Sequence, residues 1–315
     1  MKKHTFGILC LTVLAVCACG KEFELEVTSD PKLFLQCCPG PGDTTIIQLN
    51  RTFAVGRTAD NVLLLEDADI DFVVNGTPYY VARAVDTAGA VPPGCWFVVA
   101  SLQAGDEVAV EARADGFNPV SARVMLPSPA PDFTWKFNRD SVRVTFRDDP
   151  ATEDWYGLAV YCERTLINLD TGQVERELKR NLTPLNGSSD SWWYSKVRNY
   201  VDIPFNGWSF GNAWSMVRVW PDTGFSGQET TLFMPTRDIA SYVGNYEQHD
   251  RFKVRLYRVS NEFFRYGVAL EHMRSNTLAE AGLAPAAYAY SNVRGGVGVL
   301  AAWNVRETDW FTLGN

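Results

Sequence analysis

The chain has 315 residues, of which 29 are basic and 37 are acidic, giving a formal net charge of −8. Proteins that bind nucleic acids need an excess of basic residues on one face, so this balance argues against a nucleic-acid partner. The length is sufficient for two domains, each with a hydrophobic core of its own.

The N-terminus has the features of a bacterial secretion signal. The chain begins MKKH, and residues 5–18 are apolar or small, a run shorter than the roughly 20 residues of a membrane-spanning helix. The run ends in VCAC, with an aliphatic residue three positions before a cysteine and a small residue directly before it, as in a lipobox. We therefore expect a lipoprotein signal peptide over residues 1–18. An ordinary signal peptide that ends in cysteines is the alternative.

Cys19 is the expected lipidated residue, because its thiol can carry a thioether-linked diacylglyceryl group. Several acyl chains are needed for a stable anchor, since each buried CH₂ contributes only about 0.8 kcal/mol. Residues 19–30 would then form a tether between the membrane and the folded protein. Loss of residues 1–18 removes Lys2 and Lys3, so the mature chain has a net charge of −10.

Strand signals dominate residues 31–127. Short runs such as KLFLQCC, TTIIQLNRTF, CWFVVASL and EVAVEARA are rich in β-branched or aromatic residues and are separated by Gly, Pro, Asn or Asp. Asn75-Gly76 lies between two such runs and predicts a hairpin turn. The number and spacing of the runs predict an immunoglobulin-like β-sandwich over residues 31–127.

A proline-rich segment, LPSPAPD at residues 126–132, predicts a stiff linker or the entry to a new domain. The strand pattern resumes after it, so we expect a second, larger, β-sandwich-like domain over residues 128–315. One amphipathic helix is predicted near 261–275, where Ser260 is a suitable N-cap and apolar residues recur at helical spacing. The expected fold class is therefore mainly all-β.

Four cysteines besides Cys19 remain in the mature chain. Neighbouring residues of a strand point to opposite faces, so Cys37 and Cys38 can hardly pair with each other. One of them could pair with Cys95 in an oxidising compartment. Buried thiols that act as small apolar residues are the alternative for these three and for Cys162.

Several segments resemble a Bacteroidota lipoprotein family of unknown function. They are the lipobox, KLFLQCC, GFNPVSARVMLPSPAPD, VTFRDDPATEDWYGLAVY, VSNEFFRYGVAL and AYSNVRGGVGVLAAW, and their order and spacing extend over essentially the whole mature chain. Genes of that family commonly lie beside SusC-like TonB-dependent receptors. The resemblance implies a β-rich outer-membrane lipoprotein that partners such a transporter, and it implies no catalytic residues. The adjacent Cys37-Cys38 pair departs from the family pattern.

The segment directly after Cys19, GKEFELE, is charged and rich in acids. Lipoproteins of the Bacteroidota use a similar segment as a surface-export signal, and a solvated tether explains the charges equally well. We therefore expect a lipid-anchored protein of the outer membrane, on its periplasmic or its cell-surface face.

The search for catalytic chemistry yields no nucleophile–base pair and no metal-binding constellation. The motifs H-E-x-x-H and C-x-x-C are absent, and His249 and His272 have no partner at a metal-binding spacing. The Gly-rich segment NVRGGVGVL, residues 292–300, lacks the spacing of a nucleotide loop and predicts a turn or bulge where backbones pack closely. We therefore expect a protein that is not an enzyme.

Two acidic clusters could offer carboxylate oxygens to Ca²⁺. The first, Glu66, Asp67, Asp69 and Asp71, lacks the Gly and the terminal Glu of an EF-hand loop, and alternating acids on an exposed strand explain it equally well. The second is DDPATED at residues 148–154. Since neither pattern is specific, we expect no metal and no other cofactor, with Ca²⁺ as the weaker alternative.

Aromatic residues are concentrated in residues 192–220, in a setting rich in Ser, Asn and Gly. Aromatic side chains in polar loops offer flat apolar faces with a polar handle, which suits a sugar, a peptide or a partner protein. Packing in the core of the second sandwich is the alternative. The residues expected at a ligand or partner surface are Trp192, Trp193, Tyr194, Trp208 and Trp214.

Together these features predict a non-enzymatic accessory or binding subunit of a TonB-dependent nutrient-uptake system in the outer membrane. The membrane, through the N-terminal lipid, and a TonB-dependent receptor are the expected partners. A cell-surface glycan-binding module that uses exposed aromatic loops is the alternative, with a glycan or a peptide as its ligand.

Overall fold

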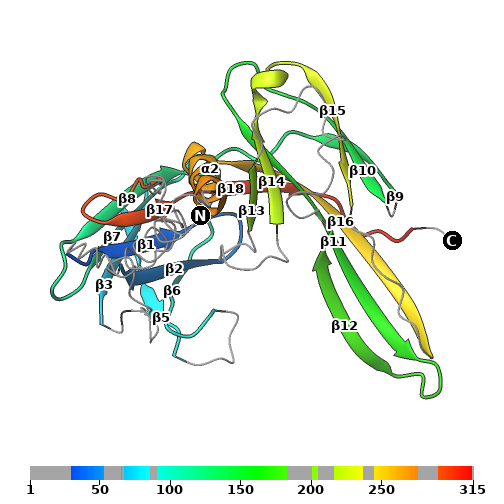
Figure 1. Ribbon diagram of the computed structural model, residues 1–315, viewed down its shortest axis with the longest axis horizontal. Helices are drawn as coiled ribbons and strands as arrows, with labels where there is room; N and C mark the ends of the chain where they lie inside the picture. The colour runs from blue at the N-terminus through cyan, green and yellow to red at the C-terminus, as the bar shows by residue number, and fades with distance from the viewer. Residues whose placement is uncertain are drawn as a thin grey trace, which may run out of the picture.

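The computed structural model describes residues 30–52, 65, 67–85, 91–138, 140–182, 201–204, 216–236, 245–275 and 290–313. Strands dominate these residues, and α2 (Asn261–Ser275) is the only α-helix among them (Figure 1). The expected fold class, mainly β and sandwich-like with one helix, is therefore confirmed. In the described part of the chain, no helix is both long and apolar enough to cross a membrane.

The first sandwich consists of two facing sheets. One sheet has the strand order β17-β1-β2-β6-β5, and the other has the order β4-β3-β7-β8. Paired strands are antiparallel except β1 and β17, which run parallel. The strands are β1 (Leu33–Cys37), β2 (Thr44–Arg51), β3 (Asp69–Val74), β4 (Thr77–Tyr79), β5 (Val81–Arg83), β6 (Trp96–Val99), β7 (Glu107–Arg113), β8 (Val120–Met125) and β17 (Val297–Leu300).

Alternation along the strands builds the core of this sandwich, here called the first core. Every second residue of a strand faces the opposite sheet, so β7 buries Val108, Val110 and Ala112 and exposes the charged residues at its ends. The turn between β3 and β4 is formed by Asn75 and Gly76, both at positive φ, as the sequence predicted. The first core includes Leu33, Leu35, Cys37, Ile47, Leu49, Phe72, Trp96, Val98, Val108, Val110, Val120, Val293, Leu300 and Ala302.

The second sandwich also has two sheets. One has the order β15-β10-β9, and the larger one has the order β13-β14-β11-β16-β18, with β12 paired to β11. The 14-residue strands β11 and β16 run side by side over their whole length. The elements are β9 (Phe133–Asn138), β10 (Ser141–Arg147), β11 (Trp155–Asn168), β12 (Val174–Asn181), β13 (Val201–Pro204), β14 (Met216–Pro221), the 3₁₀ helix η2 (Asp222–Gly224), β15 (Glu229–Pro235), β16 (Tyr246–Val259) and β18 (Trp303–Glu307).

The larger sheet is covered on both faces. Its inner face packs on β10 and β15 in the second core, which includes Val142, Val144, Phe146, Tyr156, Leu158, Val160, Cys162, Trp220, Leu232, Phe252, Val254 and Leu256. Its outer face meets α2 and the end of β17 in the third core, which consists of Cys38, Ala159, Val217, Val219, Tyr257, Val259, Phe263, Tyr266, Val299 and Ala301. The third core therefore joins the two sandwiches, and α2 lies between them in Figure 1.

The helix α2 has the bounds that the sequence predicted. The Ser260 hydroxyl accepts a hydrogen bond from the Phe263 backbone N–H at 3.3 Å and so caps its first turn. Phe263 and Tyr266 are buried on the side that faces the third core. Helical spacing thus identified the correct face of the helix.

The C-terminal segment closes one edge of the second sandwich. Arg255 pairs with Glu307, whereas Phe252 pairs with Phe311 rather than with Trp310, so one extra residue is accommodated as a bulge. Because of the bulge, the Phe311 ring turns inward, where it lies 4.1 Å from the Trp135 ring.

The proline-rich linker passes along β18 and is fixed there. Asn304 Nδ2 donates to the Pro127 carbonyl at 2.9 Å, and Arg306 Nε donates to the Ala130 carbonyl at 2.8 Å. The domain bounds 31–127 and 128–315 stay a prediction, but strand pairing crosses them, because β17 belongs to the sheet of β1.

Candidate functional site

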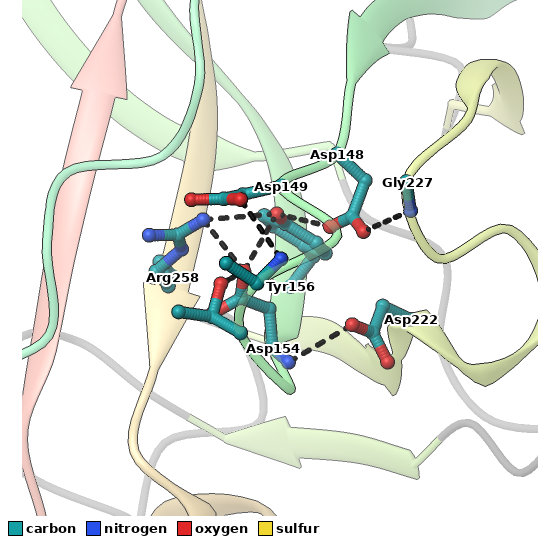
Figure 2. Close-up of polar contacts among 9 residues, drawn as sticks. Asp148, Asp149, Asp154, Tyr156, Asp222, Gly227 and Arg258 are labelled. Carbon is teal, nitrogen blue, oxygen red and sulfur yellow. Dashed lines mark hydrogen bonds and ion pairs between the residues drawn. The ribbon is translucent and has the colours of Figure 1, made fainter.

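Three buried aspartates lie together at one end of the second sandwich. Asp148, Asp154 and Asp222 are each at most 6% exposed, and one carboxylate oxygen from each lies within 4.8 Å of the others. It is the only group of three His, Cys, Asp or Glu side chains with metal-binding proximity among the described residues. With Tyr156 and Arg258 they form what we call the buried acidic network (Figure 2).

Backbone pairing brings these residues together from distant parts of the sequence. Asp148 follows β10, and its N–H continues the ladder to β15 by donating to the Gln228 carbonyl at 3.1 Å. Asp154 directly precedes β11, and the N–H of Asp222 donates to its carbonyl at 2.9 Å. Tyr156 and Arg258 are direct partners in the register of β11 and β16.

Tyr156 lies at the centre of the network. Its hydroxyl lies 2.7 Å from Asp148 Oδ1 and 3.2 Å from Asp154 Oδ2, so its single proton can serve one of the two carboxylates at a time. Arg258 Nη2 donates to Asp154 Oδ2 at 2.6 Å and to the Tyr156 hydroxyl at 3.2 Å (Figure 2). Burial raises the pKa of the Tyr156 hydroxyl, which therefore remains a donor at neutral pH.

Backbone amides and a hydroxyl complete the described contacts. The Gly227 N–H donates to Asp148 Oδ2 at 2.8 Å, and the Asp154 N–H donates to Asp222 Oδ2 at 3.1 Å. The Thr152 hydroxyl donates to Asp154 Oδ2 at 2.8 Å. The network thereby ties the loop before β11 and the η2 segment to the larger sheet.

The network contains more acid than base. Among the described contacts, Arg258 is the only cation that bonds to these carboxylates, so their full ionisation would leave an excess of buried negative charge. Burial is the main cause that raises the pKa of Asp222 above its ordinary value of 3.8, and the carboxylates of Asp148 and Asp154 add to it. Asp222 therefore takes up a proton more readily than a solvated aspartate does.

Three carboxylates at this spacing are a donor set that a hard cation such as Ca²⁺ prefers. However, the contacts above occupy both oxygens of Asp148 and one oxygen each of Asp154 and Asp222. Arg258 adds a positive charge at the same place. We therefore describe the group as a hydrogen-bonded network and assign no metal to it.

The sequence pointed to only part of this network. The acidic stretch 148–154 was recognised, and the structure turns Asp148 and Asp154 inward while Asp149 and Glu153 are exposed. Asp222 was missed because it lies 68 residues from Asp154 and shares no motif with it.

The other acidic cluster, residues 66–71, agrees with the explanation of alternating acids on an exposed strand at Asp69 and Asp71. Asp69 and Asp71 are exposed and alternate with Ile70 and Phe72 on β3. Asp71 forms an ion pair with Arg113 at 3.0 Å. Glu66 lies outside the described residues.

Among the residues that the structure describes, the histidines and cysteines are not brought together in one metal-binding group. His249 is exposed and lies 3.2 Å from the equally exposed Glu247, and His272 is exposed on the last part of α2. Cys37 and Cys38 face different cores, the first and the third, as the alternation of strand side chains predicts. Both are buried thiols, as is Cys95.

Cys19 and the whole expected recognition surface lie outside the described residues. That surface consists of Trp192, Trp193, Tyr194, Trp208 and Trp214. Trp220, the last aromatic residue of the same stretch, is fully buried in the second core. For Trp220, therefore, the core interpretation is correct.

The sequence also contains one match to the G-x-S-x-G pattern of serine hydrolases, GWSFG at residues 207–211. In hydrolases this motif occupies a turn between a strand and a helix. Here it lies between β13 and β14, which pair antiparallel with each other. The residues themselves are outside the described part of the chain.

Comparison with known proteins gives a family but no activity. No curated protein matches the chain. A family model described as a domain of unknown function, DUF4249, matches residues 20–309, which is nearly the whole chain after Cys19. The chain therefore belongs to the DUF4249 family.

Proposed function

We propose that the protein is a lipid-anchored, non-enzymatic accessory or binding subunit of a TonB-dependent nutrient-uptake system in the outer membrane of a Bacteroidota species. The observation that carries the proposal is the lipobox that ends in Cys19. A lipid at this position would tie the protein to a membrane surface through the tether 19–30.

The family match is compatible with this anchor, because it begins at residue 20, directly after Cys19. The folded body also starts close to the expected lipid, since β1 begins at Leu33. A chain of 14 residues can span at most roughly 50 Å when fully extended. The first sandwich would therefore stay near the membrane.

The packing of the two sandwiches supports a role as a structural subunit. The third core contains residues of both sandwiches and of α2, so they form a continuous apolar contact rather than two bodies on a loose linker. A body of this kind can present a docking surface to which both sandwiches contribute.

The experiment is affinity purification of a C-terminally tagged protein from detergent-solubilised native membranes, after labelling with a palmitate analogue. The proposal expects label on the protein and a stoichiometric outer-membrane barrel protein in the eluate. Cys19→Ala is the control and should abolish both the label and the complex. Label that survives Cys19→Ala refutes the anchor, and a lipidated protein that elutes alone refutes the accessory role.

A glycan-binding module is the second candidate, because aromatic residues cluster in the polar stretch around Trp192 and Trp193. Adjacent residues of an extended segment point in opposite directions, so Trp192→Ala and Trp193→Ala should differ in effect. One variant should behave nearly like the wild type. The other should be retarded less than the wild type by glycan-affinity gels, with an unchanged melting temperature. If both substitutions lower the melting temperature, the pair is part of a core and this candidate fails.

A further inference from the structure

The first sandwich is completed by a strand from the far end of the chain. β17 runs parallel to β1, with Phe34 opposite Val297 and Cys37 opposite Leu300. In Figure 1 the red β17 lies beside the blue β1. Without β17, β1 would be an edge strand whose backbone groups on that side have no partner in the sheet.

The segment that leads into β17 also reaches the second sheet of this sandwich. Arg294 and Ser121 of β8 exchange two backbone hydrogen bonds, at 2.8 and 3.0 Å. The region from Arg294 to Leu300 therefore bridges β8 of one sheet and β1 of the other. It closes one side of the sandwich.

This bridge depends on very close backbone packing. Gly298 has φ of +125°, and a Cβ there would lie 1.9 Å from the Leu35 carbonyl oxygen. Gly295 has φ of +79°, and a Cβ there would lie 2.1 Å from the Pro119 carbonyl oxygen. The close packing predicted from the Gly-rich sequence is thus confirmed, and only glycine satisfies both requirements at these positions.

The side chains after Gly298 alternate between two cores. Leu300 and Ala302 lie in the first core, whereas Val299 and Ala301 lie in the third core. The same short segment therefore completes the interior of the first sandwich and binds that sandwich to the outer face of the larger sheet.

The second sandwich fixes the position of this segment. The Ser260 N–H, at the start of α2, donates to the Ala302 carbonyl at 2.8 Å, and the Ala302 N–H donates back to the Ser260 hydroxyl at 3.1 Å. Directly afterwards, β18 pairs with β16. β17 is thus held in place by elements that do not belong to the first sandwich.

We propose that β17 is a closing strand, so that the first sandwich buries its core only after β16, α2 and β18 have placed β17 beside β1. Local hairpins such as β3–β4 need only short loops, whereas the contact between β1 and β17 closes nearly the whole chain. Contacts between such distant segments form late, because the entropy of loop closure must be lost first. This inference does not depend on the proposed function.

Two buried cysteines allow the order of closure to be measured in the complete wild-type chain. Cys37 lies in the first core and is 1% exposed, and Cys162 lies in the second core and is 2% exposed. Pulses of a thiol reagent during refolding from denaturant, read by mass spectrometry, give the time at which each thiol becomes protected. The proposal expects Cys162 to be protected before Cys37. Protection of Cys37 before Cys162, or at the same time, overturns it.

A variant tests the same idea in the folded protein. Gly298→Ala forces a Cβ against β1 and should accelerate labelling of Cys37 by about tenfold or more, with Cys162 unchanged. Gly116→Ala is the matched control, because Gly116 also has positive φ, +81°, but a Cβ there meets nothing within 4 Å. Equal acceleration of both cysteines, or none at Cys37, contradicts a closing role. If Gly298→Ala does not fold, the wild-type refolding order alone decides.

Discussion

Arg258→Met is the sharpest test of the buried acidic network. The Arg258 and Asp154 side chains are 10% and 8% exposed, and Arg258 Nη2 lies 2.6 Å from Asp154 Oδ2. Methionine keeps most of the length of the side chain but removes the cation and its hydrogen bond to the Tyr156 hydroxyl. Asp154 would then be a buried carboxylate without its counter-charge, beside two further buried carboxylates.

Breaking a buried ion pair by removing one partner costs about 3–5 kcal/mol, because the remaining charge stays desolvated. We expect Arg258→Met to lower the free energy of unfolding by this amount, measured by urea denaturation at pH 7. Arg123 and Glu107 form a matched exposed pair. Their side chains are 73% and 48% exposed, and Arg123 Nη1 lies 3.0 Å from Glu107 Oε1. Arg123→Met should cost less than about 1 kcal/mol.

The double variant Arg258→Met with Asp154→Asn separates charge from packing. Replacing Asp154 by a neutral amide removes the uncompensated charge, so the double variant should recover about 2 kcal/mol relative to Arg258→Met alone. A double variant less stable than Arg258→Met, or an Arg258→Met variant no worse than Arg123→Met, would refute the role of Arg258 as the counter-charge.

Two further predictions concern groups with defined surroundings. The pKa of Asp222 is raised in the folded state, because burial favours its protonated form. The protonated carboxyl therefore stabilises the fold fully below pH 3.8, and this stabilisation is lost as the pH rises through the folded pKa. Melting curves should therefore show a gain for Asp222→Asn over wild type that is larger at pH 7 than at pH 4, and an equal difference at both values contradicts the shift. Phe311→Ala should cost about 2–3 kcal/mol in urea denaturation, because this partly buried ring contacts Trp135 at 4.1 Å. Trp310→Ala, on the opposite face over Arg251 and Lys253, should cost about 1 kcal/mol or less, and the reverse order would show that the bulge is misplaced.

The sequence predicted the fold class well because burial leaves a local periodicity. β10 alternates with Val142, Val144 and Phe146 inward, as a strand covered on one face should. β11 instead has a continuous buried run from Tyr156 to Val160, because the larger sheet is covered on both faces. Both patterns are properties of neighbouring residues and need no knowledge of the tertiary partner.

The pairing of β17 with β1 could not be predicted in this way. The Gly-rich segment indicated a close backbone approach but not which backbone it approaches. The register is decided by Leu300 and Val299, which fit two different cores formed by the rest of the chain. The proline-rich segment at 126–132 indicated a stiff linker or the entry to a new domain, but not that side chains of β18 bond to its backbone.

The sequence pattern also could not predict which acidic residues of the candidate site are buried. A stretch of acids such as 148–154 reads as solvated because most aspartates are exposed. The inward turn of Asp148 and Asp154 follows from contacts with the nearby Tyr156 and with Gly227 and Arg258, which lie far away in the sequence. A pattern of residue types contains no information about such partners.

The persistence of this buried charged network still needs a reason. Well-packed apolar residues of similar volume often replace a buried ion pair without loss of stability, so stability alone does not explain its presence. The network could serve the fold, or it could shape a surface that docks a partner. Purification of the C-terminally tagged double variant Arg258→Met with Asp154→Asn from native membranes distinguishes these two roles. Because both side chains are at most 10% exposed and therefore offer little surface to a partner, we expect the variant to retain whatever barrel protein the wild type retains. A folded variant that melts near the wild type yet loses that partner would show that the network controls the docking surface rather than the fold.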